Sequence, residues 1–290
     1  MCSPAWPDPG RRAALRRAYL EACTIELQAL KPGNVHVHAA GHGMTVADFA
    51  LSAEASVEPL TVTAAAVGRR IRDAIAATRA AVGCNTNLGI VLLAAPLIAA
   101  AETATRGGLR SALAACLARL TVADAVLAYE AIRLAAPAGL GTAPDQDVAA
   151  TPSIDLRQAM TLAAERDRLA RQYAADFADV FDIGVAGLAR ARREGATPDW
   201  ATSLIYLDFL AAFPDSHLQR KHGVVAAERV HDDAVALRRA VGSRPREHAM
   251  ARLLAFDQRL KSAGLNPGTS ADLTVASLLA VECEDMLARA

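Results

Sequence analysis

The sequence predicts an all-α protein, a single large multi-helix domain around one buried central helix at about residues 88–101. Apolar residues recur at helical spacing through most of the chain. The chain also lacks the alternating Val/Ile runs that are typical of strands. Residues 88–101 are apolar on every side, and a helix without a polar face must be surrounded by protein or lipid. About 14 residues fall short of the ~20 that a bilayer requires, so we expect this helix in a protein core.

Composition indicates a well-packed soluble protein with reduced thiols. Hydrophobic residues make up 53% of the 290 residues and charged residues 21%, which is typical of a globular domain. Lys plus Arg equals Asp plus Glu at 31 each, and aromatic residues are only 4%, so no nucleic-acid-binding surface is expected. Five scattered cysteines have neither metal nor disulfide spacing. We expect a flexible N-terminus over residues 1–10 without a signal segment, one helical domain over 11–290, and a cytoplasmic location.

Helix breakers and capping signals divide the chain into its elements. Lys31 precedes Pro32 and ends the first helix, because a residue before proline is pushed out of the helical region. The tetrapeptide at 45–48 matches a capping box, and it recurs at 121–124. Residues 154–193 are expected to form one long helix or two abutting ones. The other helices are expected over 11–30, 45–58, 61–82, 88–101, 109–120, 121–136, 200–212, 224–241 and 246–263, with a last one that contains Asp272.

Polar residues gather in the connections between these helices, at 31–44, 83–87, 137–153, 213–223 and 264–272. In an up-and-down helical domain, alternate connections lie at the same end. We therefore expect several of these loops to line one cleft. The chain contains no Walker loop, G-x-S-x-G or H-E-x-x-H motif, so the common nucleotide-binding and hydrolase folds are not supported.

Several of the polar residues have a structural interpretation beside a functional one. At the start of the central helix, Asn85 or Thr86 could merely cap the helix, or its N–H groups could bind a phosphate. Asp48 is expected first as a helix cap and second as a catalytic acid. The loop at Gly268 could cradle a phosphate or be a plain turn. The loop histidines could bind a metal or be ordinary loop residues: His36, His38 and His42.

Six short motifs then fall in one order along the chain. They are K-P-G-N-V at 31–35, F-x-x-S at 49–52, N-T-N-L-G at 85–89, D-x-x-x-x-x-Y at 167–173, P-D-S-H with R-K-H-G within 214–223, and P-G-T-S-A-D-L at 267–273. This order resembles the triphosphoribosyl-dephospho-CoA synthase family over nearly the whole length. The resemblance implies an all-helical pentosyltransferase that takes ATP and 3′-dephospho-CoA, releases adenine, and joins the triphosphoribosyl unit to the ribose 2′-hydroxyl. The product would be a prosthetic-group precursor.

The implied reaction needs cations or Mg²⁺ on the triphosphate and a base for the acceptor hydroxyl. Either Asp215 or His217 could be that base, and Asp48 is a further catalytic candidate. Mg²⁺ takes oxygen ligands, for which we expect Asp147 and Asp272. The expected ATP- and substrate-binding residues are Lys31, Asn34, Ser52, Asn85, Thr86, Asn87, Arg220, Lys221, His222, Gly268 and Ser270.

The chain departs from the pattern of the lyase-linked branch at Gly43, at Asn87 and Leu88, and at 221–223. The most consequential departure is Leu88, where that branch has a lysine. The change removes a cation that could pair with a triphosphate, so Lys31, Arg220 or Lys221 is expected to compensate. The alternative functions are a related ribosyl or phosphoribosyl transfer in another cofactor pathway, such as that of a pterin C1 carrier, an Mg²⁺-dependent N-glycosyl hydrolase, and a non-catalytic scaffold. The expected partners are small-molecule substrates rather than nucleic acid or membrane, and a homodimer is one expected assembly.

Overall fold

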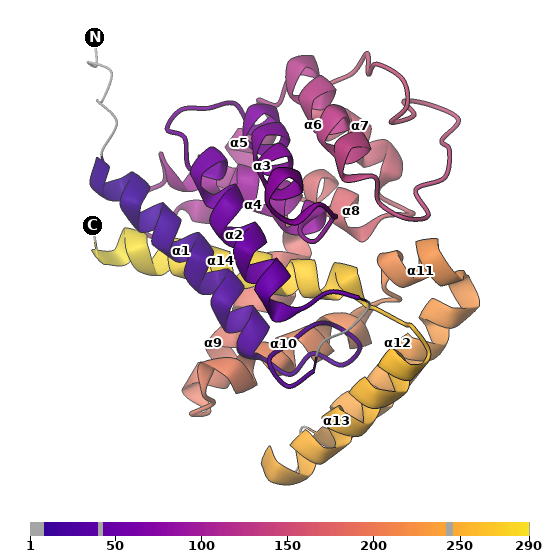
Figure 1. Cartoon of the computed structure of the whole chain (residues 1–290). Helices are drawn as coiled ribbons and strands as arrows, with labels where there is room; N and C mark the ends of the chain where they lie inside the picture. Colours follow the sequence, from indigo (N-terminus) through magenta and orange to yellow (C-terminus); the bar gives the residue numbers. More distant parts are fainter. Residues whose placement is uncertain (1–8, 40–42, 242–245, 290) are drawn as a thin grey trace.

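The computed structural model describes residues 9–39, 43–241 and 246–289 (Figure 1). These ranges contain 14 α-helices, one π-helix and no strand, which confirms the all-α class and gives more helices than expected. Of the expected flexible N-terminus, residues 1–8 lie outside the described ranges, and Pro9 and Gly10 already belong to the first helix.

The helices have the following bounds. The first half of the chain holds α1 (Pro9–Gln28), α2 (Val46–Leu60), α3 (Val67–Val82), α4 (Leu88–Ala101), α5 (Leu109–Leu117) and α6 (Val122–Ala135). The second half holds α7 (Leu156–Ala163), α8 (Arg168–Ala174), the π-helix η1 (Val180–Val185), α9 (Ala186–Arg193), α10 (Pro198–Ala212), α11 (Ser216–His222), α12 (Val224–Val241), α13 (Arg246–Ser262) and α14 (Gly268–Arg289). In the described ranges no single helix is long and apolar enough to span a membrane; α5 and α6 pass that test only as a pair, bent by 95°.

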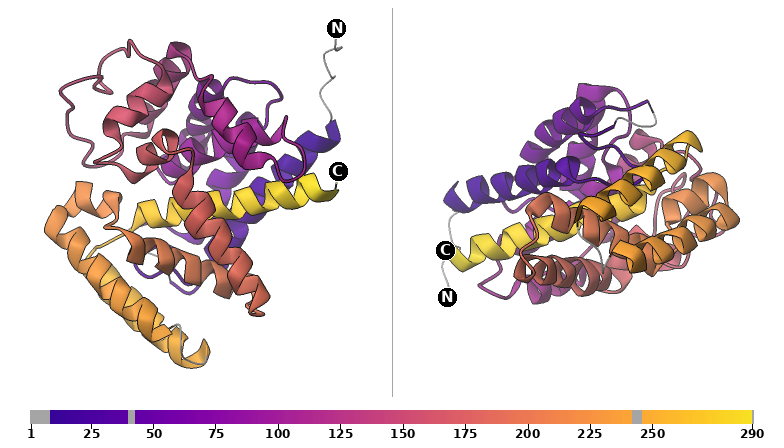
Figure 2. Two further views of the ribbon diagram at one scale, coloured as in Figure 1. Left: turned by 180° about the vertical axis from the view of Figure 1, so that it is seen from behind. Right: turned by 90° about the horizontal axis from the view of Figure 1, so that it is seen from below.

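The last helix, α14, crosses the middle of the molecule (Figure 1). It packs against α1, α4, η1 and α10, which come from both halves of the chain. α1 begins and α14 ends on the same side of the molecule (Figure 2). α12 and α13 pack against each other and extend away from this body (Figures 1 and 2). The helices are therefore arranged around α14, with α4 beside it in the core.

The expected central helix is buried as its sequence requires, since every residue of α4 except Ala99 is buried. Pro96 lies inside this helix and has no N–H, so the carbonyl of Leu92, four residues earlier, loses its helical donor. The hydroxyl of Tyr173 on α8 donates to that carbonyl at 2.6 Å. This hydrogen bond anchors α8 on α4 where the helix would otherwise leave a buried acceptor unsatisfied.

Aspartate caps divide the chain at places where periodicity alone suggested continuity. Residues 154–193 form four elements, α7, α8, η1 and α9, rather than the expected one or two. The side chain of Asp155 accepts from the Gln158 N–H, and that of Asp167 accepts from the N–H groups of two residues in the first turn of α8. Such caps satisfy the first N–H groups of a new helix and so favour a new start. Likewise Asp215 begins α11, where a loop was expected.

The boundary between α2 and α3 also differs from the expected one. α2 continues through Pro59 to Leu60, although the sequence suggested an end at residue 58. The Thr61 N–H donates to the Val57 carbonyl at 3.1 Å and closes the last turn. α3 then begins at Val67 rather than at residue 61.

Tyr173→Phe is expected to lower the free energy of unfolding by about 1–3 kcal/mol, because it leaves the buried Leu92 carbonyl without its donor. Urea denaturation of both proteins measures the difference. The matched control is the same change in a Pro96→Ala background, where residue 96 regains an N–H for that carbonyl. In the Pro96→Ala background, Tyr173→Phe should lower the free energy of unfolding by less than it does in wild type. Equal losses in both backgrounds would contradict this role for Tyr173.

Candidate active site

A cavity of about 600 Å³ lies among the first turns of α4, α11 and α14, with α6, α7, α8 and the connection 136–155 completing its wall. Its volume falls within the roughly 300–1,000 Å³ that is typical of small-molecule sites. All five polar loops contribute residues to it, so the expected meeting of these loops at one site is found.

The expected site residues divide into two groups. Those that line the cavity are Asn34, Asn85, Thr86, Asp147, His217, Arg220, Lys221, Gly268 and Asp272. Those outside its lining are Lys31, Asp48, Ser52, Asn87, Asp215, His222 and Ser270. Most of the second group hold the first group in place, as their hydrogen bonds show.

Asp215 joins the first turns of two helices behind the cavity wall. Its Oδ1 accepts from the N–H groups of His217 and Leu218 at 2.9 and 3.1 Å, which caps α11. Its Oδ2 accepts from the backbone N–H and the hydroxyl of Ser270, both at 2.8 Å, in the first turn of α14. The side chain is fully buried, and this burial raises its pKa although the four hydrogen bonds oppose the shift. Both carboxylate oxygens are thus occupied and neither lines the cavity, so these contacts position the first turns of α11 and α14.

Further contacts fix the same junction from a third helix. The Ser216 and Thr269 hydroxyls lie 2.9 Å apart, and the Ser216 hydroxyl also accepts from the Arg168 N–H at the start of α8. His217 is held on the cavity wall with its ring over Gly268, where a Cβ would meet Nδ1 at 3.1 Å. The interlocked starts of α8, α11 and α14 therefore set the position of the His217 imidazole.

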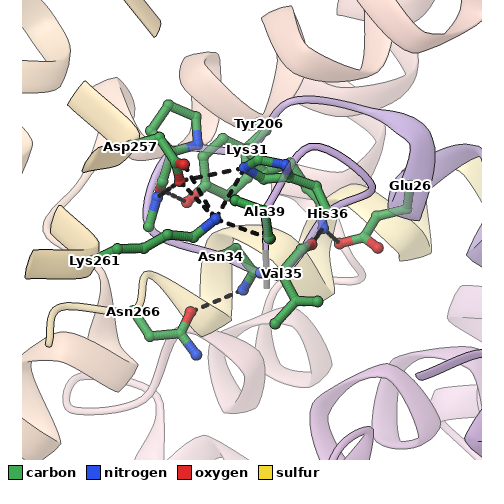
Figure 3. A network of polar contacts seen from close by, with 12 residues as sticks. Glu26, Lys31, Asn34, Val35, His36, Ala39, Tyr206, Asp257, Lys261 and Asn266 are labelled. Carbon is green, nitrogen blue, oxygen red and sulfur yellow. Dashed lines mark hydrogen bonds and ion pairs between the residues drawn. The ribbon is translucent and has the colours of Figure 1, made fainter. Parts of the chain in front are cut away.

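Lys31 lies behind the cavity instead of on its surface. It is fully buried, and its Nζ donates to the Glu26 carboxylate at 2.5 Å, to the Asn34 side-chain oxygen at 3.2 Å, and to the Val35 carbonyl at 2.7 Å (Figure 3). An ammonium group has three donors, so all are used. Burial lowers the pKa of Lys31 and raises that of Glu26, and their ion pair opposes both shifts. Lys31 thus neutralises Glu26, which does line the cavity.

The K-P-G-N-V loop is tied to α13 and to the connection that leads from α13 into α14 (Figure 3). The Gly33 N–H donates to Asp257 on α13 at 2.8 Å, and the Asn34 side chain donates to Asn266 at 2.8 Å. Gly33 has φ of 83°, and a Cβ there would lie 2.8 Å from the Leu265 carbonyl oxygen. A left-handed conformation and a close backbone approach both require glycine here. These ties place Asn34 and Asn266 together on the cavity wall.

The N-T-N-L-G segment lies over a buried hydroxyl cluster on α2. Asn85 accepts from the Leu88 N–H at 3.2 Å and so caps α4, which is the structural alternative that the sequence offered. The hydroxyls of Thr86 and Ser52 lie 2.6 Å apart, and the amide of Asn87 donates to Ser56 at 3.3 Å. Ser52 and Asn87 therefore support Asn85 and Thr86 from below, and only the latter two face the cavity.

Asp48 and the histidines outside the cavity have structural surroundings. Asp48 forms a capping box with Thr45, whose N–H and hydroxyl lower the pKa of that carboxyl. His36 lies 3.3 Å from Asp257 and 3.1 Å from the Lys261 ammonium, so its contacts are those of an ion-pair network. Among the described residues no group of three metal-ligating side chains occurs, and His42 lies outside them.

Asp147 and Asp272, the two expected metal ligands, have different surroundings. Asp147 accepts from the N–H groups of Ala149 and Ala143 at 2.8 and 2.5 Å, and these bonds lower the pKa of that carboxyl. Asp272 lies against α4, where a Cβ on Gly89 would fall 2.0 Å from its Oδ2. The pKa of Asp272 lies well above its usual value, mainly because burial removes water from the carboxyl group. Repulsion by carboxylate neighbours on other elements adds to this shift.

Cations at this site come from two elements. Arg220 donates to Asp167 at 3.2 Å and to the Ala138 carbonyl at 3.3 Å, so it joins α11 to the connection before α7. Lys221 and Arg166 are exposed side chains that also line the cavity. Arg166 belongs to no motif, and its only signal in the sequence is its place next to Asp167 of D-x-x-x-x-x-Y.

The apolar part of the cavity wall was not among the predicted site residues. These side chains come from the ends of α6 and α7 and from the connection between them: Ile132, Leu140, Val148, Met160, Leu162 and Ala163. Such residues carry no chemical motif, and their helical periodicity assigned them to ordinary packing.

Lys31→Ala is expected to lower the free energy of unfolding by about 3–5 kcal/mol, because it leaves the buried Glu26 carboxylate unpaired. Urea denaturation at neutral pH measures the loss. A Glu26→Gln, Lys31→Met double variant removes both charges and should lose less than the single variant. A single variant as stable as wild type would contradict a structural role for this ion pair.

Asp272→Asn is expected to stabilise the fold at high pH. A carboxyl with a raised pKa in the folded state contributes stability below its unfolded pKa of about 3.9 and loses it as pH rises through the folded pKa. The amide does not titrate, so the variant should exceed wild type in melting temperature at pH 8 and approach it near pH 4. Parallel melting-temperature curves across this range would contradict the raised pKa.

A family model described as ATP:dephospho-CoA triphosphoribosyl transferase matches residues 12–289, nearly the whole chain. A similar solved structure is a proposed triphosphoribosyl-dephospho-CoA synthase from Archaeoglobus fulgidus, with a TM-score of 0.60 and 24% sequence identity. The likeness covers 81% of this chain and 97% of that one, and at this identity it concerns the fold. No curated protein matches the chain. The family match, together with the motifs now found around one cavity, shows that the chain belongs to the ATP:dephospho-CoA triphosphoribosyl transferases, a family of pentosyltransferases.

Proposed function

We propose that this protein transfers the triphosphoribosyl unit of ATP to the 2′-hydroxyl of dephospho-CoA and releases adenine. The observation that supports this most is the cavity itself, where the family's separated motifs supply cations, amides, an imidazole and carboxyl groups to one space. Transfer between two bound substrates requires such a space, since the acceptor oxygen must be held in line with the sugar carbon that it attacks.

The triphosphate is best accommodated beside Arg166, Arg220 and Lys221. Leu88 presents no charge at the start of α4, so the positive charge comes from α11 and from the residue before Asp167 instead. The first turns of α4 and α14 also line this space, and helix N-termini favour anions. The absent lysine is thereby compensated by arginine and lysine side chains from other elements, with Lys31 left to its buried ion pair.

His217 is the general base that the geometry favours. Its imidazole lies on the cavity wall next to the Arg220 guanidinium, with Nδ1 and Nη2 3.5 Å apart. The other candidate, Asp215, has both oxygens engaged with backbone and hydroxyl donors. A base must reach the proton it removes, and only His217 of the two faces the substrate space.

Mg²⁺ fits this site as an ion brought in with the nucleotide. Magnesium is commonly held by one or two carboxylates together with substrate phosphates, so a preformed three-ligand group is not required. Asp145 and Asp147 both line the cavity from the same connection and are the oxygen donors we assign to it. Bound there, the ion would neutralise phosphate charge.

The apolar wall formed by α6 and α7 suits the less polar parts of the substrates. The side chains on that wall are apolar, among them Ile132, Met160 and Leu162, whereas the side chains that α11 contributes include cations. A purine ring or a pantetheine arm buries favourably against such side chains. This division into a cationic and an apolar region suits substrates that carry both a polyphosphate and a long neutral arm.

The deciding experiment is adenine release from ATP and Mg²⁺, with and without dephospho-CoA. Release should require the acceptor, and the product should carry the triphosphoribosyl unit by mass spectrometry. Adenine release without any acceptor would favour an N-glycosyl hydrolase, and release only with a pterin-type acceptor would favour the other cofactor pathway. No release under any condition would contradict the proposed function.

Arg166→Ala and Lys221→Ala are each expected to raise KM for ATP about tenfold, equivalent to ~1.4 kcal/mol, through loss of a phosphate contact. Melting temperatures should be unchanged, because both side chains are exposed. The matched control is Arg239→Ala, an exposed arginine on α12 that does not line the cavity. Unchanged KM in both cavity variants would place the triphosphate elsewhere.

A further inference from the structure

The transfer removes one proton from the acceptor hydroxyl and adds one to the departing purine. The site therefore needs one group that accepts a proton and one that donates a proton. This inference rests on the proposed function and extends it to the second of these groups. His217 and Asp272 lie along one face of α14: the His217 ring packs on Gly268, and Asp272 follows Gly268 by four residues, one helical turn. Both side chains line the cavity.

Asp272 differs from the other carboxylates around it by its contacts. Glu26 is paired with Lys31 at 2.5 Å, Asp167 with Arg220 at 3.2 Å, and Asp215 accepts four hydrogen bonds. In the described part of the chain no ion pair and no hydrogen bond involves the Asp272 carboxyl group. It lies against Gly89 of the N-T-N-L-G motif, where any larger residue would displace it.

These surroundings favour a protonated Asp272. Burial removes water from the carboxyl group, and its carboxylate neighbours repel a further negative charge. Arg220, the cation that opposes these effects, is already engaged by Asp167. A carboxylic acid that keeps its proton near neutral pH can enter a reaction as a donor. Because a protonated Asp272 carries no negative charge, it is poorly suited to be the anionic magnesium ligand that the sequence suggested.

We propose that Asp272 is the general acid that protonates adenine as it leaves, while His217 accepts the proton of the acceptor hydroxyl. The C1′–N9 bond breaks and its electron pair passes into the purine, which takes the Asp272 proton on a ring nitrogen and departs neutral. The acceptor oxygen forms the new bond to C1′, and its proton passes to the His217 imidazole. Return of that proton from imidazolium to the Asp272 carboxylate resets both groups, so atoms and charge balance.

Asp272→Asn tests this assignment, because the amide keeps the shape of the acid but cannot give up a proton in the same way. With ATP and dephospho-CoA, kcat should fall by about 10²- to 10⁴-fold. KM for ATP should change by less than about threefold, since the residue is not assigned to phosphate binding. The magnesium concentration for half-maximal rate should stay unchanged, whereas loss of a metal ligand would raise it.

A donor methylated at purine N7 separates acid catalysis from other roles. Its base leaves as a neutral molecule without taking up a proton, so Asp272→Asn should lose less than about tenfold in kcat with this donor. Equal losses with ATP and with the methylated donor would overturn the proposal, and so would a kcat within about threefold of wild type with ATP.

Gly89→Ala provides a second variant that leaves Asp272 in the sequence. Its Cβ would fall 2.0 Å from Oδ2, so the carboxyl group must move away, and kcat with ATP should fall with the same partial rescue by the methylated donor. The matched control is Glu282→Gln, a half-buried acid on the same helix outside the cavity, which should keep wild-type kinetics. Lack of turnover by wild type would contradict the proposed function itself, whereas a kcat of Asp272→Asn within about threefold of an active wild type contradicts this inference alone.

Discussion

The four hydrogen bonds of the buried Asp215 carboxylate are the constraint on which the site depends most. One oxygen caps α11 and the other holds the first turn of α14, so two helices from different parts of the chain begin at one point. Each end would otherwise leave N–H groups buried without acceptors. Because a carboxylate satisfies both at once, the His217 imidazole above Gly268 has a fixed place.

Two lysine–carboxylate ion pairs behind the cavity constrain its wall in a similar way. Lys31 and Lys261 are both drawn into the interior, where Glu26 and Asp257 are their respective carboxylate partners. Neither pair needs to add much net stability, since desolvation offsets most of the attraction. Their effect is geometric, because Lys31 joins the end of α1 to the loop that follows it, and Lys261 joins the same loop to α13 through the Ala39 carbonyl (Figure 3).

Much of the fold was predictable because apolar periodicity is a strong signal, as the buried α4 shows. The site was predictable at the level of loops, and less so for single residues. Lys31 has the charge of a phosphate ligand, and only the packing of Glu26 reveals its burial. Asp167 belongs to a motif of the family and Asp215 was a candidate base, and the structure adds that both side chains cap helices. Sequence patterns report which residues are polar, whereas capping and burial depend on neighbours that are distant in the chain.

The path of the chain has a consequence for its synthesis. Glu26 and Asp272 line one cavity although nearly the whole sequence lies between them. Contacts of such long sequence separation must overcome the entropy of closing a large loop before they contribute stability. α14 follows all the other described helices in the chain, and it supplies both the centre of the core and one side of the cavity. A growing chain therefore has no complete cavity until α14 has been synthesised and has docked.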